Sequence, residues 1–148
     1  MNKYTLNLNN ECLTVITDTN GLIGILEHPG ALKRTLELFN GKSVKIVILT
    51  CVLKEIKRIR DYSTSEVLSQ VSSLLHSRVS VLRANSDIKT VASQLESKYT
   101  QAHFPDSLLV ACAVICSFAI LSYDHGLLYC AKNEGVRTFT PKFGVNLK

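Results

Sequence analysis

Leu13-Thr14-Val15-Ile16-Thr17-Asp18-Thr19-Asn20 is an apolar, β-branched run that ends at an acidic residue and two small polar ones. Because β-branched residues favour strands, the run predicts a buried strand over residues 13–18, with a turn at Gly21. In open α/β sheets, ligands bind outside the carboxyl ends of the parallel strands. The stretch therefore predicts a strand that brings a carboxylate to the functional edge of a sheet.

The rest of the chain alternates between strand-like and helix-like segments. Further strands are expected at residues 44–49, 79–82, 119–122 and 136–140. The segments between them carry helical periodicity, and Ser63-Thr64-Ser65-Glu66 is a capping box that opens one helix. Alternation of this kind predicts an α/β fold, a three-layer α/β/α sandwich around a central, mainly parallel sheet of four to five strands. We expect a flexible arm or edge element over residues 1–12 and one domain over residues 13–148.

Composition bounds the kind of protein and its partners. The chain has 148 residues, of which 46% are hydrophobic and 20% charged, as in a globular domain with a sizeable core. The formal net charge of +5 favours polyanionic partners such as RNA or DNA.

Cysteine usage and hydropathy indicate the compartment. The five cysteines form no paired pattern, so they predict free thiols in a reducing cytoplasm. Cys112 and Cys116 are spaced as i and i+4, but without further ligands nearby they are better explained as small buried side chains than as zinc ligands. The apolar run 108–123 is short for a membrane span and divides into a helix and a strand, so no membrane association is expected.

Four carboxylates follow strand ends or open helices in the expected fold. Asp18 and Asp124 end the first and fourth strands, whereas Glu55 and Asp106 lie in the first turns of two helices. Parallel strands bring all four to one edge of the sheet. Because converging carboxylates repel each other unless a cation neutralises them, the pattern indicates a metal site. Oxygen ligands without a thiolate or imidazole cluster select hard cations, Mg²⁺ or Mn²⁺.

Each acid also has an ordinary structural explanation. Asp18 could simply end a strand, and Glu55 could be a solvated residue paired with Arg58. Asp106 could complement a helix dipole, and Asp124 could cap the helix that follows it. Four acids at equivalent positions of the sheet are harder to explain in this way than any one of them.

The ordered set of acids resembles the PIN-domain nucleases over roughly residues 13–140. The family's strand ending in Asp is matched by Ile16-Thr17-Asp18-Thr19-Asn20, and its Glu after the second strand by Thr50-Cys51-Val52-Leu53-Lys54-Glu55-Ile56. Its Asp opening an Ala-rich helix is matched by Pro105-Asp106-Ser107-Leu108-Leu109-Val110-Ala111-Cys112-Ala113, and its last strand by Leu121-Ser122-Tyr123-Asp124.

The resemblance implies a Mg²⁺- or Mn²⁺-dependent endoribonuclease that often forms homodimers. The catalytic and metal-binding residues it implies are Asp18, Glu55, Asp106 and Asp124. Thr19, Asn20 and Ser122 would orient the carboxylates or a water molecule from behind. An ion held by these groups would activate water for in-line attack on an RNA phosphodiester. Arg58, one turn after Glu55, and His125, beside Asp124, are expected substrate contacts, each with a plain surface role as the alternative.

The resemblance leaves several alternatives open. Many members carry a further Asp two residues after the fourth acid, where this chain has Gly126, so the site could hold one metal ion or two. The nuclease could be the toxin of a toxin–antitoxin pair, binding a small antitoxin in a groove walled by helices at residues 22–26 and 67–75, or an RNA-processing enzyme. The alternative to an enzyme is a non-catalytic RNA-binding or assembly domain on the same fold. A phosphatase with an Asp nucleophile would need a second Asp where Asn20 stands.

Overall fold

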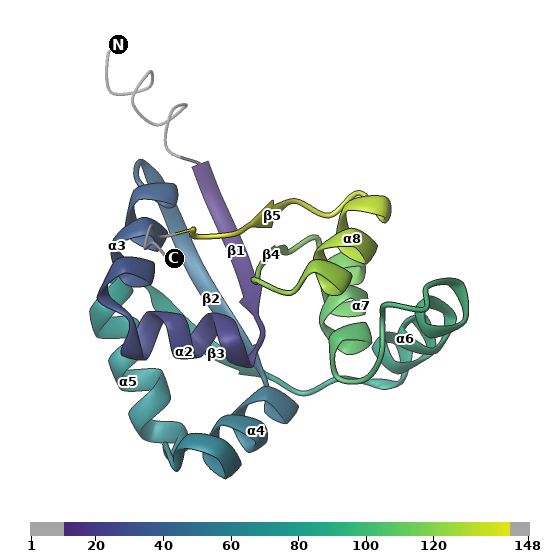
Figure 1. Ribbon diagram of the computed structural model, residues 1–148, viewed down its shortest axis with the longest axis horizontal. Coiled ribbons are helices and arrows are strands. Elements are labelled where there is room, and N and C mark those ends of the chain that lie inside the picture. Colours follow the sequence, from purple (N-terminus) through teal and green to yellow (C-terminus); the bar gives the residue numbers. More distant parts are fainter. Residues whose placement is uncertain (1–10, 143–148) are drawn as a thin grey trace, which may run out of the picture.

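The central sheet consists of parallel strands in the order β3-β2-β1-β4-β5 (Figure 1). The structure is a computed structural model that describes residues 11–142. Every strand pairing among these residues is parallel, as predicted. The strands are β1 (Glu11–Thr17), β2 (Lys42–Leu49), β3 (Arg78–Leu82), β4 (Ala119–Leu121) and β5 (Thr138–Phe139).

Helices cover both faces of the sheet, which confirms the predicted three-layer arrangement (Figure 1). One layer holds α2 (Thr19–Glu27), α3 (Pro29–Leu38) and α5 (Thr64–Leu75). The other holds α6 (Ser86–Lys98), α7 (Asp106–Cys116) and α8 (His125–Asn133). Helix α4 (Thr50–Arg60) begins directly at the carboxyl end of β2. The elements that follow β1, β2 and β4 therefore all start at the same edge of the sheet.

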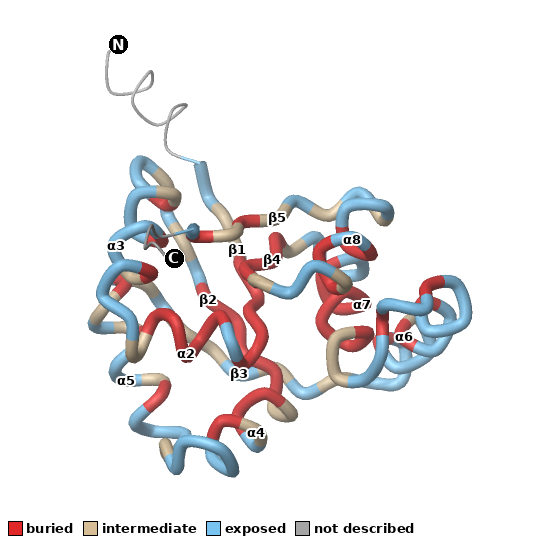
Figure 2. The backbone as a smooth tube through the Cα atoms, viewed as in Figure 1, coloured by how far each residue is buried: buried red, intermediate tan, exposed pale blue. Residues whose placement is uncertain are grey.

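The sheet becomes more deeply buried toward this carboxyl edge. The first residues of β1 and β2 are exposed or half-buried, whereas the last ones, such as Ile16 and Val47, are buried (Figure 2). Ile16 is paired with Val47 of β2 on one side and with Ile120 of β4 on the other. Because β1 is the central strand, the residue that follows it emerges in the middle of the edge.

The observed boundaries differ from the expected ones near β1. Helix α2 begins at Thr19, directly after the strand, because Asp18 is its N-cap and leaves no room for the expected turn at Gly21. Pro29, expected to close that helix, instead occupies the first turn of α3, where its missing N–H costs nothing. Glu11 and Cys12 belong to β1. Residues 1–10, the remainder of the expected arm, lie outside the described residues.

The apolar sides of α2 and α5 pack into the protein's own core. Leu22 and Ile25 of α2 and Val67 and Val71 of α5 are all buried. These helices were the expected walls of an antitoxin groove, and other apolar residues on them, such as Leu68, are only half-buried. Within residues 11–142, every helix is too short or too polar to cross a membrane.

Candidate active site

Asp18 connects the central strand to the first helix. Its Oδ1 accepts a hydrogen bond of 2.8 Å from the backbone N–H of Gly21, which caps α2. The first turn of α2 lies so close to the strand ends that a Cβ added to Gly21 would stand 2.0 Å from Oγ1 of Thr17. That hydroxyl in turn donates to the carbonyl of Leu121 over 2.9 Å. A glycine is therefore required here to hold Asp18 against the sheet edge.

Ser122 joins the carboxylates at the ends of β1 and β4. Its hydroxyl donates to Oδ2 of Asp18 over 2.6 Å and accepts the backbone N–H of Asp124 over 3.0 Å. Ser122 is fully buried, so this bond lies in a low-dielectric environment. Asp124 itself caps α8 by accepting the N–H of Leu127 over 2.9 Å. The predicted supporting role of Ser122 thus has a geometric basis, because its hydroxyl contacts one acid and the backbone of another.

Glu55 approaches the same edge from α4. Its Oε1 accepts a short hydrogen bond from the hydroxyl of Thr19, which is buried beside Asp18. Its other oxygen, Oε2, lies 3.7 Å from the guanidinium of Arg58, which is largely exposed. Glu55 is thus linked to the β1 end through Thr19, and Arg58 partly neutralises it from the solvent side.

Asp106 is the first residue of α7 and enters the cavity from the other helical layer. It is half-buried, and its side chain makes no hydrogen bond with another described residue. Burial, together with the nearby carboxylates of Asp124, Asp18 and Glu55, raises the pKa of Asp106 to about 6. Asp106 is therefore within electrostatic range of each of the other three acids.

The four acids line one small cavity. Its volume is about 150 Å³, and Thr19 and Asn20 contribute to its wall. Of the residues lining it, none is a cation, histidine or cysteine. Over residues 11–142, however, no three acidic, histidine or cysteine side chains lie close enough together to hold one ion. The carboxylates of Asp18, Asp124 and Glu55 are turned toward protein donors, so side-chain rotation would be needed to gather them on a cation.

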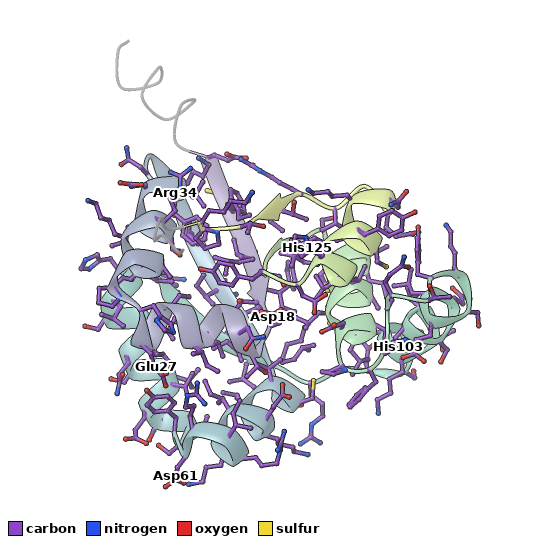
Figure 3. The ribbon with its side chains drawn as sticks, in the orientation of Figure 1. Asp18, Glu27, Arg34, Asp61, His103 and His125 are labelled. Atoms are coloured by element: carbon purple, nitrogen blue, oxygen red, sulfur yellow. The ribbon has the colours of Figure 1, made fainter. Side chains whose placement is uncertain are left out.

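Burial affects Asp18 in a different way from Asp106. Desolvation raises the pKa of Asp18 above its ordinary value, and the hydrogen bonds from Ser122 and Gly21 offset part of that rise. The Asp18 carboxylate therefore has donors that partly compensate its burial. Figure 3 shows this side chain near the centre of the molecule, where the end of β1 meets α2.

Gly126 stands where many PIN-domain nucleases have a fifth acid, and the space beside it is filled. A Cβ at this position would lie 3.0 Å from Cβ and 3.2 Å from the carbonyl oxygen of Gln101. Gln101 belongs to the segment between α6 and α7. The departure from the family pattern is therefore more than a missing side chain, because a neighbouring segment packs against the site.

Three of the sequence-predicted residues do not line the cavity, namely the buried Ser122 behind Asp18 and the two expected substrate contacts. Arg58 and His125 are exposed and do not line it. Arg58 contacts it only through Glu55, and Figure 3 shows His125 at the start of α8. Sequence reasoning missed two contacts, the Gly21 N–H on Asp18 and the approach of Gln101 to Gly126. The first could have been found from the Asp-x-x-Gly spacing typical of an N-cap, whereas the second has no local sequence signal.

Comparisons with known proteins agree with this architecture. A family model described as PIN domain matches residues 15–142. No curated protein matches the chain. Among solved structures, VapBC2 from Rickettsia felis bound to a DNA fragment from their promoter contains a chain with a TM-score of 0.64 and 16% identity. The match covers 88% of this chain and 100% of that one.

Two further solved structures have similar folds at low identity. DNA-bound VapBC from Salmonella typhimurium matches with a TM-score of 0.60 and 16% identity, over 88% of this chain and 99% of that one. VapBC-1 from nontypeable Haemophilus influenzae matches with a TM-score of 0.61 and 12% identity, over 86% and 98%. At these identities the likeness establishes the fold.

Proposed function

The chain belongs to the PIN-domain family, and from this premise we propose that it is a metal-dependent endoribonuclease. The observation that carries the proposal is the cavity at the carboxyl edge, which four carboxylates line and to whose lining no cation contributes. A protein that needs these acids only for structure would not bring Asp106 to a place that disfavours its charge.

The chemistry of the cavity fits a hard divalent ion. The side chains available are carboxylate, hydroxyl and amide oxygens, which suit Mg²⁺ or Mn²⁺ and not zinc. Asp18, Asp106 and Asp124 would hold the ion, and Glu55 would do so directly or through a water molecule. When bound, such an ion activates water and stabilises negative charge on a phosphate. Because Gln101 fills the space beside Gly126, the proposal assigns metal binding to these four acids without a fifth.

The remaining residues of the edge would keep the carboxylates in place. Ser122 and the backbone N–H of Gly21 hold the two oxygens of Asp18 at the end of β1. Thr19 holds Glu55 near the same strand end, and Arg58 lies beside it on the solvent side. Asn20, exposed at the cavity wall, is positioned to contact a water or a phosphate oxygen. These contacts reduce the reorganisation needed when substrate binds.

Within this function, we favour the toxin of a toxin–antitoxin pair over an RNA-processing enzyme. The support is that the structures with similar folds include VapBC assemblies from three bacteria. A small antitoxin and a second copy of the chain are then the expected protein partners. In the groove expected between α2 and α5, half-buried apolar residues such as Leu26 and Leu68 would contact the antitoxin.

The test is cleavage of structured and unstructured RNAs with Mg²⁺, with Mn²⁺ and with EDTA. We expect cleavage only with metal, and a loss of at least about 100-fold in rate for Asp106→Asn and Asp18→Asn. Asp87→Asn, which changes an exposed first-turn acid of α6 remote from the cavity, is the matched control. Cleavage by a folded Asp106→Asn protein at the wild-type rate would refute the assignment.

A metal titration separates the enzyme from a non-catalytic domain. Mn²⁺ should raise the melting temperature of the wild-type protein and have much less effect on Asp106→Asn, since binding to the folded state stabilises it. A protein that binds RNA but is not stabilised by Mn²⁺ would instead be an RNA-binding or assembly module.

A further inference from the structure

A second hollow lies beside the acidic cavity and has a different character. It measures about 710 Å³ and is bordered by α4, the end of β3 and the segment before α7. Its floor is apolar, and its rim carries several cations and the exposed ring of Phe104. We call it the basic groove, lined among others by Leu53, Lys54, Arg83, Lys89, Phe104 and Leu108.

The basic groove and the acidic cavity share two walls. On α4, Glu55 borders the cavity, and Cys51, four positions earlier and therefore next to it on the helix surface, borders the groove. Before α7, Phe104 borders the groove and the following Pro105 and Asp106 border the cavity. The groove and the cavity therefore adjoin along α4 and along the segment before α7.

Three of the groove's cations are free to contact a ligand. Lys54, Arg83 and Lys89 are exposed, and none forms an ion pair with another residue in the described part of the chain. Lys57, by contrast, lies 2.6 Å from Asp61. Unpaired cations around one hollow attract a polyanion such as a nucleic acid.

Phe104 places an exposed aromatic ring at the edge of the basic groove, which attraction of phosphates does not require. Its side chain is 66% exposed, the largest exposure among the large hydrophobic residues of the described chain. An aromatic ring held out beside cations fits an unpaired nucleobase, because stacking needs a free base face. A duplex hides its base faces within the stack, so it could use the cations but not the ring.

We propose that the basic groove binds the single-stranded segment of RNA next to the scissile phosphate. Lys54, Arg83 and Lys89 contact its phosphates, and Phe104 stacks on one of its bases. This assignment rests on the proposed ribonuclease function and adds the strandedness and path of the substrate. It also gives α4 a double role, since the helix separates the groove from the acidic cavity.

Binding can be tested without cleavage. The probe is a fluorescent 2′-O-methyl RNA single strand, which resists hydrolysis, measured by anisotropy in EDTA across a salt series. We expect Phe104→Ala to weaken binding about tenfold. The triple variant Lys54→Gln, Arg83→Gln, Lys89→Gln should reduce the slope of log affinity against log salt by about 2, because each phosphate that a cation neutralises on a single strand accounts for ~0.7 of that slope.

Matched controls remove trivial explanations. Tyr129→Ala removes another exposed aromatic ring, on α8. A second triple variant, Lys33→Gln, Lys45→Gln, Lys132→Gln, makes the same change in net charge at exposed sites outside the groove. Both control variants should bind the probe within about twofold of wild type, with most of the wild-type salt slope retained. Circular dichroism and melting confirm that each variant is folded.

The outcomes separate this inference from the proposed function. Three results would each refute RNA binding in the groove. The first is equal binding by Phe104→Ala and wild type, and the second is an equal loss of binding in the two triple variants. The third is tighter binding of a duplex of the same sequence than of the single strand. Absence of metal-dependent cleavage alongside the expected binding losses would overturn the nuclease and leave the groove standing. If the wild-type protein cleaves RNA normally but the groove variants bind the probe as tightly as wild type, the nuclease function stands and the groove proposal is wrong.

Discussion

The two walls of the acidic cavity hold their carboxylates in opposite ways. On the β1 side, Asp18 receives a hydrogen bond from Ser122 and another from Gly21, and it caps a helix. On the α7 side, Asp106 has no hydrogen-bonding partner among the described side chains, and its pKa is raised to about 6. Asp18 therefore makes hydrogen bonds that stabilise the fold, whereas the charged form of Asp106 destabilises it.

The difference distinguishes an acid that the fold needs for its stability from one whose position is better explained by function. The cost of burying a carboxylate falls when hydrogen-bond donors offset part of its desolvation, as Ser122 and Gly21 do for Asp18. Asp106 lacks this compensation, so its negative charge costs folding free energy that only a cation or a proton can recover. Strain of this kind without a structural use is characteristic of functional sites. Substitutions on the two walls should therefore change stability with opposite signs.

The largest expected change in the free energy of unfolding comes from adding a side chain at Gly21, where α2 packs against the end of β1. Gly21→Ala would place a methyl group 2.0 Å from Oγ1 of Thr17, forcing α2 away from the sheet and opening the hydrogen bond to Leu121. We expect a loss of about 3 kcal/mol in urea unfolding. Gly24→Ala, in the same helix with its nearest contact at 3.3 Å, should change stability by less than about 1 kcal/mol. Equal effects at both glycines would mean that the wall is not tightly packed.

Removing the carboxylate of the β1 wall should have the next largest effect. Asp18→Ala removes the cap of α2 and leaves the buried Ser122 hydroxyl without its acceptor. We expect destabilisation of about 2 kcal/mol by chemical denaturation without metal. Asp18→Asn keeps an acceptor for the Gly21 N–H and should lose less. An Asp18→Ala protein as stable as wild type would contradict the structural role.

Removing the charge of the α7 wall should have the smallest effect, and its sign should be reversed. Since the pKa of Asp106 rises from 3.8 to about 6 on folding, the folded state binds this proton more tightly than the unfolded state does. The wild-type protein therefore loses stability as the pH rises between these values. Asp106→Asn should be more stable than wild type by about 1 kcal/mol at neutral pH, a value reduced for solvent screening because the group is only half-buried.

That gain should disappear in acid, where the wild-type carboxyl is protonated as well. Urea unfolding at about pH 4 and about pH 7 in EDTA measures both values. Asp87→Asn controls for removing a first-turn acid from an exposed helix end. A neutral-pH loss of stability in Asp106→Asn would show that the two walls do not differ as described.

Much of the fold could be predicted because its signals are local. The β-branched run 44–49 is part of β2, whose last four residues are buried, and the capping box at Ser63 and Glu66 forms with both of its hydrogen bonds. The start of α2 was misplaced because Gly21 suggested a turn. In the structure this glycine serves close packing, which depends on Thr17 and Leu121 across the sheet edge.

The acids of the site could be proposed from topology, whereas their surroundings could not. Sequence order alone placed Asp18 and Asp124 at strand ends, since parallel strands share an edge. That Ser122 bonds to Asp18, and that Gln101 fills the space at Gly126, depends on side-chain packing between distant segments. Arg58 and His125 were chosen for their nearness in sequence to acids, but helix geometry turned both toward solvent.

The bond between Ser122 and Asp18 joins residues 104 positions apart in the chain. During synthesis Asp18 therefore leaves the ribosome long before β4 and Asp124 do. Native contacts of such long range also form late in folding, because closing a large loop must precede them. A nascent chain therefore carries its acids apart until β4 has emerged and paired with β1. A nuclease built in this way would lack its cutting site while residues 18–121 are being made beside ribosomal and messenger RNA.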